Sequence, residues 1–205
     1  MRVIAGVARR LPLKTVSGLD TRPTIDKIKE TLFNILAPYV AGSNFLDLFC
    51  GSGSIGIEAL SRGAVKCAFV DNSAKAIACV RENLEFTRLS EGAVVLQKNA
   101  ISAINELRLR KYTFDIVYID PPYFEGLEEA TLKALAESGI ITEDTIVIVE
   151  ADRFNDLEFI PESAFEITRE KKYKTNRHYF LRLKSGSNDT DTSNSNEESN
   201  LSGDI

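Results

Sequence analysis

The chain has 205 residues, of which 43% are hydrophobic, and this suits one soluble domain with a sizeable core. It has no apolar run of transmembrane length, and its first residues lack the apolar stretch of a signal peptide, so we expect a cytoplasmic protein with no membrane contact. The net charge of −5 comes from residues 185–205, which hold five acidic and no basic side chains.

Strand-like and helix-like segments alternate from the start of the chain. Residues 2–7 and 11–16 predict a small hairpin, and Thr24 is a candidate N-cap for a helix over residues 25–39. A short apolar strand over residues 44–49 ends at a glycine-rich turn. A helix over residues 55–62, with Gly63 at its C-cap, and a strand over residues 66–70 follow.

The second half continues the alternation. Ser73 caps a helix that runs to about residue 89, and then come a strand over 94–96 and a helix over 100–110. The almost wholly apolar segment 114–119 is typical of a buried parallel strand. A helix over 125–137 and a strand over 145–149 precede two final strands. Those two, residues 165–172 and 178–183, have no helix between them and predict an antiparallel hairpin at one edge of the sheet.

This order predicts an α/β fold of the class I methyltransferase (Rossmann-like) type. We expect a mostly parallel seven-stranded sheet with helices on both faces, an antiparallel C-terminal edge hairpin and a small N-terminal hairpin and helix extension. One methyltransferase domain should cover residues 1–184, including an N-terminal arm over residues 1–40. Residues 185–205 have too little apolar surface to offset the entropy of ordering and predict a disordered polar tail.

The glycine-rich turn predicts a nucleotide-type cofactor site. Its glycines match G-x-G-x-x-G, and Gly51 and Gly53 would let a ligand approach the backbone. Asp71 ends the next strand 20 residues after Gly51, where a carboxylate can bind ribose hydroxyls. The pattern alone fits NAD or S-adenosylmethionine. Asp47 favours the latter, because it could hold a cationic amino-acid group that NAD lacks, and Asn99 could contact the adenine edge or simply cap the next helix.

A second motif follows the apolar strand over residues 114–119. Asp120 could accept one hydrogen of an exocyclic base amine and the Pro121 carbonyl the other, which would localise the nitrogen lone pair for methylation. Pro121 and Pro122 stiffen the segment, and Tyr123 could stack on a base turned out of its helix or loop. Asp-Pro-Pro can also be a plain strand-ending turn, but its place after the fourth strand of such a domain favours catalysis.

The remaining reactive side chains indicate no metal site. Cys50, Cys67 and Cys79 are widely spaced, and the chain has a single histidine, His178, so we expect reduced, buried cysteines and a surface or RNA-contacting histidine. Residues 1–30 hold seven basic and three acidic side chains, and residues 169–184 hold seven and one. Basic chain ends indicate a polyanion-facing surface or a solvated charged face. The candidate phosphate contacts are Arg9, Arg10, Lys14, Lys171, Lys172, Lys174 and Arg177.

Several of these segments together resemble the RsmD family, bacterial 16S rRNA guanine-N2 methyltransferases. The resemblance rests on Arg22-Pro23-Thr24, on residues 29–34, 46–53 and 58–64, and on Asp120-Pro121-Pro122-Tyr123. It implies a cytoplasmic enzyme, which we expect to be a monomer, that uses S-adenosyl-L-methionine on a guanine of 16S rRNA in the small ribosomal subunit. By analogy, Arg22 and Thr24 would close over the cofactor. Asn99 departs from the aspartate that relatives often have.

Three other functions remain open at this point. Adenine-N6 methylation of DNA or RNA shares the Asp-Pro-Pro-Tyr motif, although no separate target-recognition domain is evident. An NAD-dependent oxidoreductase would need an acid–base group, and the one histidine lies near the end of the chain. A noncatalytic RNA-binding module would not require the Asp120 loop.

Overall fold

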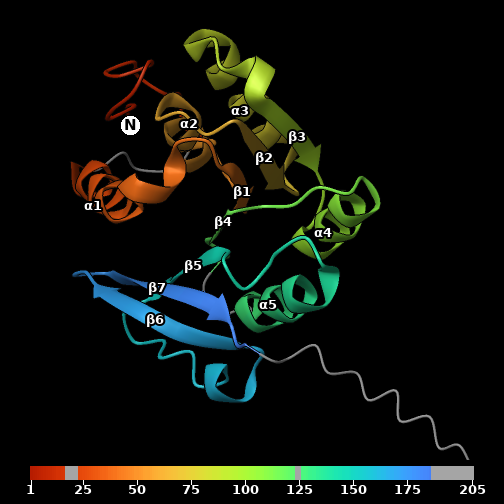
Figure 1. The fold of residues 1–205 in the computed structure, drawn as a ribbon. Coiled ribbons are helices and arrows are strands. Elements are labelled where there is room, and N and C mark those ends of the chain that lie inside the picture. Colours follow the sequence, from red (N-terminus) through yellow and green to blue (C-terminus); the bar gives the residue numbers. More distant parts are fainter. Residues whose placement is uncertain (17–22, 123–125, 186–205) are drawn as a thin grey trace, which may run out of the picture.

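The chain forms one seven-stranded sheet with the strand order β3-β2-β1-β4-β5-β7-β6 (Figure 1). The structure, a computed structural model, describes residues 1–16, 23–122 and 126–185, without the side chains of residues 23–25. The strands are β1 (Asn44–Leu48), β2 (Lys66–Asp71), β3 (Ala93–Gln97), β4 (Ile116–Ile119), β5 (Ile146–Asp152), β6 (Phe165–Lys172) and β7 (Asn176–Leu183). β1 to β5 pair in parallel, and β7 is antiparallel to both β5 and β6. The predicted sheet and its closing hairpin are therefore confirmed.

In the described part of the chain, five α-helices cover the two faces of this sheet (Figure 1). They are α1 (Pro23–Val40), α2 (Ser54–Ser61), α3 (Ala74–Thr87), α4 (Ala100–Leu109) and α5 (Leu127–Ser138). The first three pack on one face and the last two on the other, as the two separate hydrophobic clusters show. Within the described residues, no helix is both long enough and apolar enough to cross a membrane.

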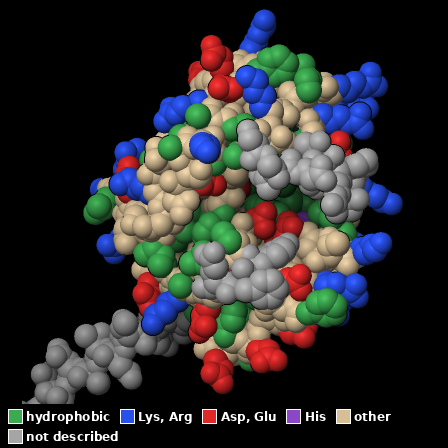
Figure 2. Space-filling model, turned by 180° about the vertical axis from the view of Figure 1, so that it is seen from behind, with side chains coloured by type: hydrophobic (Ala, Val, Ile, Leu, Met, Phe, Trp, Pro, Cys, Tyr) green, Lys and Arg blue, Asp and Glu red, His purple; other side chains and the backbone are tan. Residues whose placement is uncertain are grey.

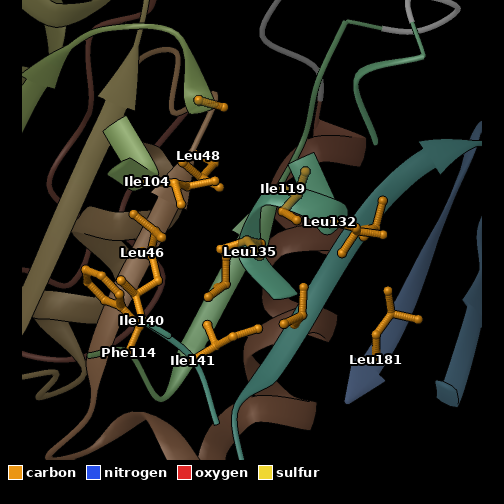
Figure 3. Close-up of a cluster of buried hydrophobic side chains, with 14 of the residues drawn as sticks. Leu46, Leu48, Ile104, Phe114, Ile119, Leu132, Leu135, Ile140, Ile141 and Leu181 are labelled. Carbon is orange, nitrogen blue, oxygen red and sulfur yellow. The ribbon is translucent and has the colours of Figure 1, made fainter. Parts of the chain in front are cut away.

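The core between the sheet and the α4–α5 layer is shown in Figure 3. Leu46 and Leu48 from β1 lie against Ile104 of α4, and Leu132 and Leu135 of α5 belong to the same cluster. These side chains are at most 1% exposed, and each contributes roughly 1.5–3 kcal/mol by its burial. A buried hydrophobic core thus fixes the strands whose carboxyl ends carry the polar motifs.

Two predicted helix caps can be compared with the structure. The Ser73 side chain accepts a hydrogen bond from the Ala76 N–H at 3.3 Å, so Ser73 is the N-cap of α3 as predicted. The prediction for Thr24 is wrong, because α1 already begins at Pro23 and Thr24 lies in its first turn. Proline suits the first helical position, since its missing N–H would have no partner there.

The N-terminal arm pairs with α2 as well as with itself. The predicted hairpin is reduced to one antiparallel bridge, Arg2 to Pro12. Instead, the Ser61 hydroxyl accepts from the Ala8 N–H at 3.0 Å and donates to the Ala5 carbonyl at 2.6 Å. Three backbone hydrogen bonds still join the two segments, from the N–H groups of Val3, Arg10 and Leu13 to the carbonyls of Leu11, Val3 and Met1. The arm is therefore a short irregular pairing that also binds α2.

Candidate active site

The carboxyl edge of the sheet carries an acidic side chain on each of four neighbouring strands. Asp71 ends β2, Asp47 lies in β1, Asp120 follows β4 and Glu150 lies in β5. Figure 2 shows carboxylates gathered in a hollow at the centre of one face, bordered by hydrophobic side chains. The sequence motifs predicted three of these four groups. Glu150 was missed, although it carries the same signal as Asp120, an acidic residue at the carboxyl end of an apolar strand.

The glycine turn joins β1 to α2 at this edge. Gly51 and Gly53 have φ angles of 55° and 77°, which L side chains rarely adopt. A Cβ at Gly51 would meet nothing within 4 Å, whereas one at Gly53 would lie 3.1 Å from the Val80 Cγ2 atom. Gly53 is therefore needed for packing as well as for the turn, and Gly51 leaves open space on its outer side.

Asp71 is oriented by the backbone of this turn. Its Oδ2 atom accepts from the Gly51 N–H at 2.9 Å, and its Oδ1 atom accepts from the Ser73 N–H at 2.8 Å. Two N–H donors hold the carboxylate at the rim, where it remains partly exposed. Such an oriented carboxylate can accept further hydrogen bonds from vicinal hydroxyl groups.

Asp47 is a buried acid with a single hydrogen bond among the described residues. The side chain accepts from the Gly56 N–H at 2.9 Å and is 2% exposed. Burial raises the pKa of Asp47 to about 7, and the neighbouring Asp71 adds to the rise while the Gly56 hydrogen bond opposes it. A cationic ligand group would offset this cost, so the donor set fits an ammonium or a sulfonium better than a neutral group.

Asn99 has a structural role that the sequence left open. It is the N-cap of α4, and its Oδ1 atom accepts from the Ser102 N–H at 2.8 Å. The residue is exposed beyond the end of β3, two strands from the glycine turn. The cap is confirmed, and the adenine contact stays a prediction.

The Asp120 loop begins one residue after β4. Asp120 is half-buried, Pro121 is buried and Pro122 is exposed, while Tyr123 lies outside the described residues, as does Arg22. Burial raises the pKa of Asp120 well above its usual range, and the charges of Glu150 and Asp47 raise it further. Of Thr24 the structure gives only the backbone position.

Glu150 lies beside this loop in a buried polar network. Its Oε2 atom accepts from the Tyr118 hydroxyl and lies 3.0 Å from the His178 Nε2 atom, and its Oε1 atom accepts from the Asn176 amide. These hydrogen bonds lower the pKa of Glu150 against the effect of its burial. His178 is fully buried, so its expected position on the surface is wrong: β7 lies between β5 and β6 rather than at the edge.

This network is not saturated. Within the described residues, three buried polar atoms around it have no hydrogen-bond partner, namely His178 Nδ1, Asn176 Oδ1 and Tyr173 Oη. The Tyr173 and His178 rings meet edge to face with centroids 5.0 Å apart. Polar side chains thus surround Glu150 both from β4 and from the β7 region.

A second buried network ties the N-terminal arm to α2. The Glu58 carboxylate is fully buried and accepts from the Ile4 and Ala5 N–H groups at 2.8 and 3.0 Å. The Lys29 ammonium lies 3.2 Å from Glu58 Oε2 and donates to the Arg2 carbonyl at 2.7 Å. Glu58 is therefore a buried carboxylate that is paired with a cation and with backbone N–H groups.

The arm also reaches the glycine turn. Asn83 of α3 donates to the Ser52 carbonyl at 2.9 Å and to the Lys14 carbonyl at 3.0 Å, and it accepts from the Lys14 N–H at 2.8 Å. One buried amide therefore connects the end of the arm to the turn. Sequence patterns do not reveal this contact, because its partners are 31 and 69 residues away.

The basic candidates differ in their freedom to bind phosphate. Arg9, Arg10 and Lys174 are exposed, and Lys14 and Lys172 are exposed but lie beside Glu82 and Glu170. Arg177 contacts Asp156 and Glu170, and its side chain is only 12% exposed. Arg177 therefore stabilises the β5–β7 region through ion pairs and is a poor candidate for binding an RNA phosphate.

The cysteines form no reactive centre. Cys50, Cys67 and Cys79 are free and buried, as predicted. Burial raises the pKa of the Cys50 thiol, and the nearby Asp47 and Asp71 charges raise it further, so a thiolate nucleophile is disfavoured beside the turn. No cluster of possible metal ligands exists in the part of the chain that the structure describes.

Comparisons with known proteins cover almost the whole domain. The model of the family described as "Conserved hypothetical protein 95" matches residues 1–182. "Putative rRNA methyltransferase YlbH" of Bacillus subtilis is 41% identical over 172 residues, which is 84% of this chain and 92% of the relative. "Ribosomal RNA small subunit methyltransferase D" of Escherichia coli is 35% identical over 173 residues, 83% and 84% of the two chains. The solved structure "Putative methyltransferase yhhF from Escherichia coli" has 32% identity and a TM-score of 0.77, covering 89% of this chain and 97% of that one.

Proposed function

Since the chain belongs to the Conserved hypothetical protein 95 family, the RsmD family of ribosomal RNA methyltransferases, we propose that it methylates a guanine of 16S rRNA. The acceptor is the exocyclic N2 amine, and the methyl donor is S-adenosyl-L-methionine. The observation that carries the proposal is the place of Asp120 at the end of β4, next to β1 with its glycine turn and Asp47. Cofactor and acceptor groups thereby share one edge of the sheet.

The residues of the turn fit this cofactor. When bound, S-adenosyl-L-methionine supplies a methyl group on a positively charged sulfonium. Asp71, held by two N–H groups, accepts hydrogen bonds from the ribose hydroxyls, and buried Asp47 balances the cationic amino-acid moiety. Gly51 provides the open approach to the backbone. Asn99, Arg22 and Thr24 complete the proposed cofactor contacts.

The Asp120 loop acts on the acceptor amine. The Asp120 carboxylate and the Pro121 carbonyl accept the two amine hydrogens, which holds the nitrogen lone pair toward the methyl group. Pro122 stiffens the loop, and Tyr123 stacks on the target base. The exposed basic residues at both chain ends contact rRNA phosphates, and the enzyme works as a cytoplasmic monomer on the small subunit.

Mapping of base methylation in 16S rRNA tests this function. Mass spectrometry of rRNA from cells with and without the gene should show the loss of one N2-methylguanine, restored by the wild-type gene but not by an Asp120→Ala gene. A loss of N6-methyladenine instead would support the adenine alternative. An unchanged methylation map would refute rRNA methylation.

A further inference from the structure

Glu150 stands at the same level of the sheet as the catalytic Asp120. β4 and β5 are parallel with Ile119 opposite Val149, so the next residue on each strand is Asp120 and Glu150. Two carboxylates on adjacent strands of one buried sheet repel each other strongly. Among the residues that the structure describes, no lysine or arginine contacts either carboxylate, so the pair needs a reason beyond packing.

The two carboxylates are treated differently by their surroundings. Glu150 takes hydrogen bonds from three side chains, Tyr118 of β4 and Asn176 and His178 of β7. Within the described ranges, no residue donates a hydrogen bond or forms an ion pair to Asp120. The three donors stabilise the ionised form of Glu150. Asp120 lacks such donors, so of the two carboxylates it is the one that binds a proton more readily.

The titratable groups that face Asp120 all act in one direction. Glu150 faces it from β5 and Asp47 from β1, and both charges, with burial, raise the pKa of Asp120. Tyr118 of β4 lies near both carboxylates and donates to Glu150. Tyr173 faces Glu150 from the β6–β7 connection. The surroundings of Asp120 and Glu150 therefore favour a proton on Asp120 and a negative charge on Glu150.

We propose that Glu150 is a positioning residue whose charge, held by Tyr118, His178 and Asn176, makes Asp120 the acceptor of the proton that the methylated amine releases. This rests on the proposed function, since it assigns a second step to the same site. If Asp120 only accepted a hydrogen bond from the amine, the reaction would not need the Glu150 network. Proton transfer to Asp120 gives that network a role.

The atoms and charges balance. The acceptor nitrogen forms a bond to the methyl carbon as the carbon–sulfur bond breaks, and the bonding electron pair stays on sulfur. The nitrogen then carries a positive charge and one hydrogen too many. That hydrogen passes as a proton to the Asp120 carboxylate, which becomes neutral and later returns the proton to water. Glu150 keeps its charge throughout and exchanges no atom.

Substitution Glu150→Gln isolates the charge. The new amide has the size of the carboxylate, and the Asn176 side chain can turn so that its unpartnered Oδ1 atom accepts from it. Glu166→Gln on the exposed outer strand β6 removes the same charge away from the site and serves as the control. Tyr118→Phe removes one donor to Glu150 and keeps the ring that meets His178 edge to face.

The first measurement needs neither RNA nor cofactor. ¹³C NMR of carboxyl-labelled aspartate follows the titration of Asp120, assigned by its loss in Asp120→Asn. We expect the Asp120 pKa to fall in Glu150→Gln, because the neighbouring charge is lost, and to fall by less in Tyr118→Phe. Glu166→Gln should leave it unchanged. If the Asp120 pKa is the same in Glu150→Gln and in the Glu166→Gln control, the proposal is overturned. If Glu150→Gln does not fold, the same comparison is made between Tyr118→Phe and the control.

The second measurement is the pH profile of kcat with rRNA. In Glu150→Gln the acidic limb should move to lower pH and the plateau should fall about tenfold, because Asp120 becomes the weaker base. His178→Gln should keep an acidic limb, since the limb belongs to Asp120. A limb that vanishes with His178 contradicts the proposal. A wild-type enzyme that transfers no methyl group to rRNA would instead refute the proposed function, and the NMR result would stand by itself.

Discussion

The two halves of the sheet's carboxyl edge hold their carboxylates by different means. On the β1–β2 half, backbone N–H groups of the glycine turn orient Asp47 and Asp71. On the β4–β5–β7 half, side chains from separate strands hold Glu150, and three buried polar atoms nearby have no partner among the described residues. A half built from one turn is rigid by local geometry, whereas a half built from distant side chains can exchange partners when a base enters.

The largest effect is expected from Asp120→Ala, which removes the amine contact of the second half. Methyl transfer should fall by about 10³-fold or more, because one preorganised group at the reacting atoms is worth that much. Calorimetry should show cofactor affinity close to wild type, since the β1–β2 half is intact. Asp115→Ala, before the start of the same strand, is the control. Comparable losses of cofactor binding and turnover would show that the halves are not separable.

Next comes Glu58→Ala, which tests the buried network of the arm. The change leaves the Lys29 ammonium and two N–H groups buried without their acceptor, and this should destabilise the protein by roughly 3–5 kcal/mol. Urea unfolding measures it. Glu82→Ala, which breaks the exposed contact with Lys14, should change stability little. Equal effects of both changes would contradict a structural role for the buried network.

Asp47→Asn sharpens the comparison through pH. The pKa of folded Asp47 is about 7 and its ordinary value is 3.8, so the folded protein binds more protons than the unfolded chain between these values. Stability without cofactor should therefore fall as pH rises through this window, by up to roughly 4 kcal/mol. Asp47→Asn should reduce that fall, and the part that remains belongs to groups such as Asp120 whose pKa is also raised, as urea unfolding at pH 5 and pH 8 would show. A wild-type stability that stays flat between these pH values excludes the shift.

A smaller effect is expected from Asp71→Asn. Loss of the charge that accepts ribose hydroxyls should weaken cofactor binding about tenfold, measured by calorimetry. Asp152→Asn is a matched control in the other half, because Asp152 also accepts from the N–H two residues later, at 2.9 Å, after a strand. If both variants bind the cofactor like wild type, Asp71 is not part of the site.

The smallest effect is expected from deletion of residues 185–205. Their polar composition predicts a segment without a role in catalysis, so turnover and stability should stay within about 0.5 kcal/mol of the full chain. Methyl transfer to rRNA and thermal unfolding of the truncated protein measure this. A large loss in either would show that the tail supports one half of the edge.

Local patterns in the sequence predicted most of the fold. Hydrophobic periodicity located the five α-helices and seven strands of the described residues, and Ser73 is the N-cap of α3 as predicted. The C-cap of α2 is Arg62, one residue before the predicted Gly63. The N-terminal hairpin was overpredicted in length: its two segments meet only around the Arg2–Pro12 bridge, and the arm also binds Ser61 and Glu58 of α2. The start of the first helix was placed two residues too late, at residue 25 after a Thr24 cap, since Pro23 can begin a helix.

The sequence by itself determined the β1–β2 half of the site. Asp47, Gly51 and Asp71 are joined by a turn and one strand, so their spacing carries their geometry. Only the tertiary structure decided the other half. Glu150 and His178 are 28 residues apart and meet because β7 returns antiparallel beside β5. Pairing of that kind depends on which strands become neighbours, and the free energy of burying both sheet faces decides that, rather than any local pattern.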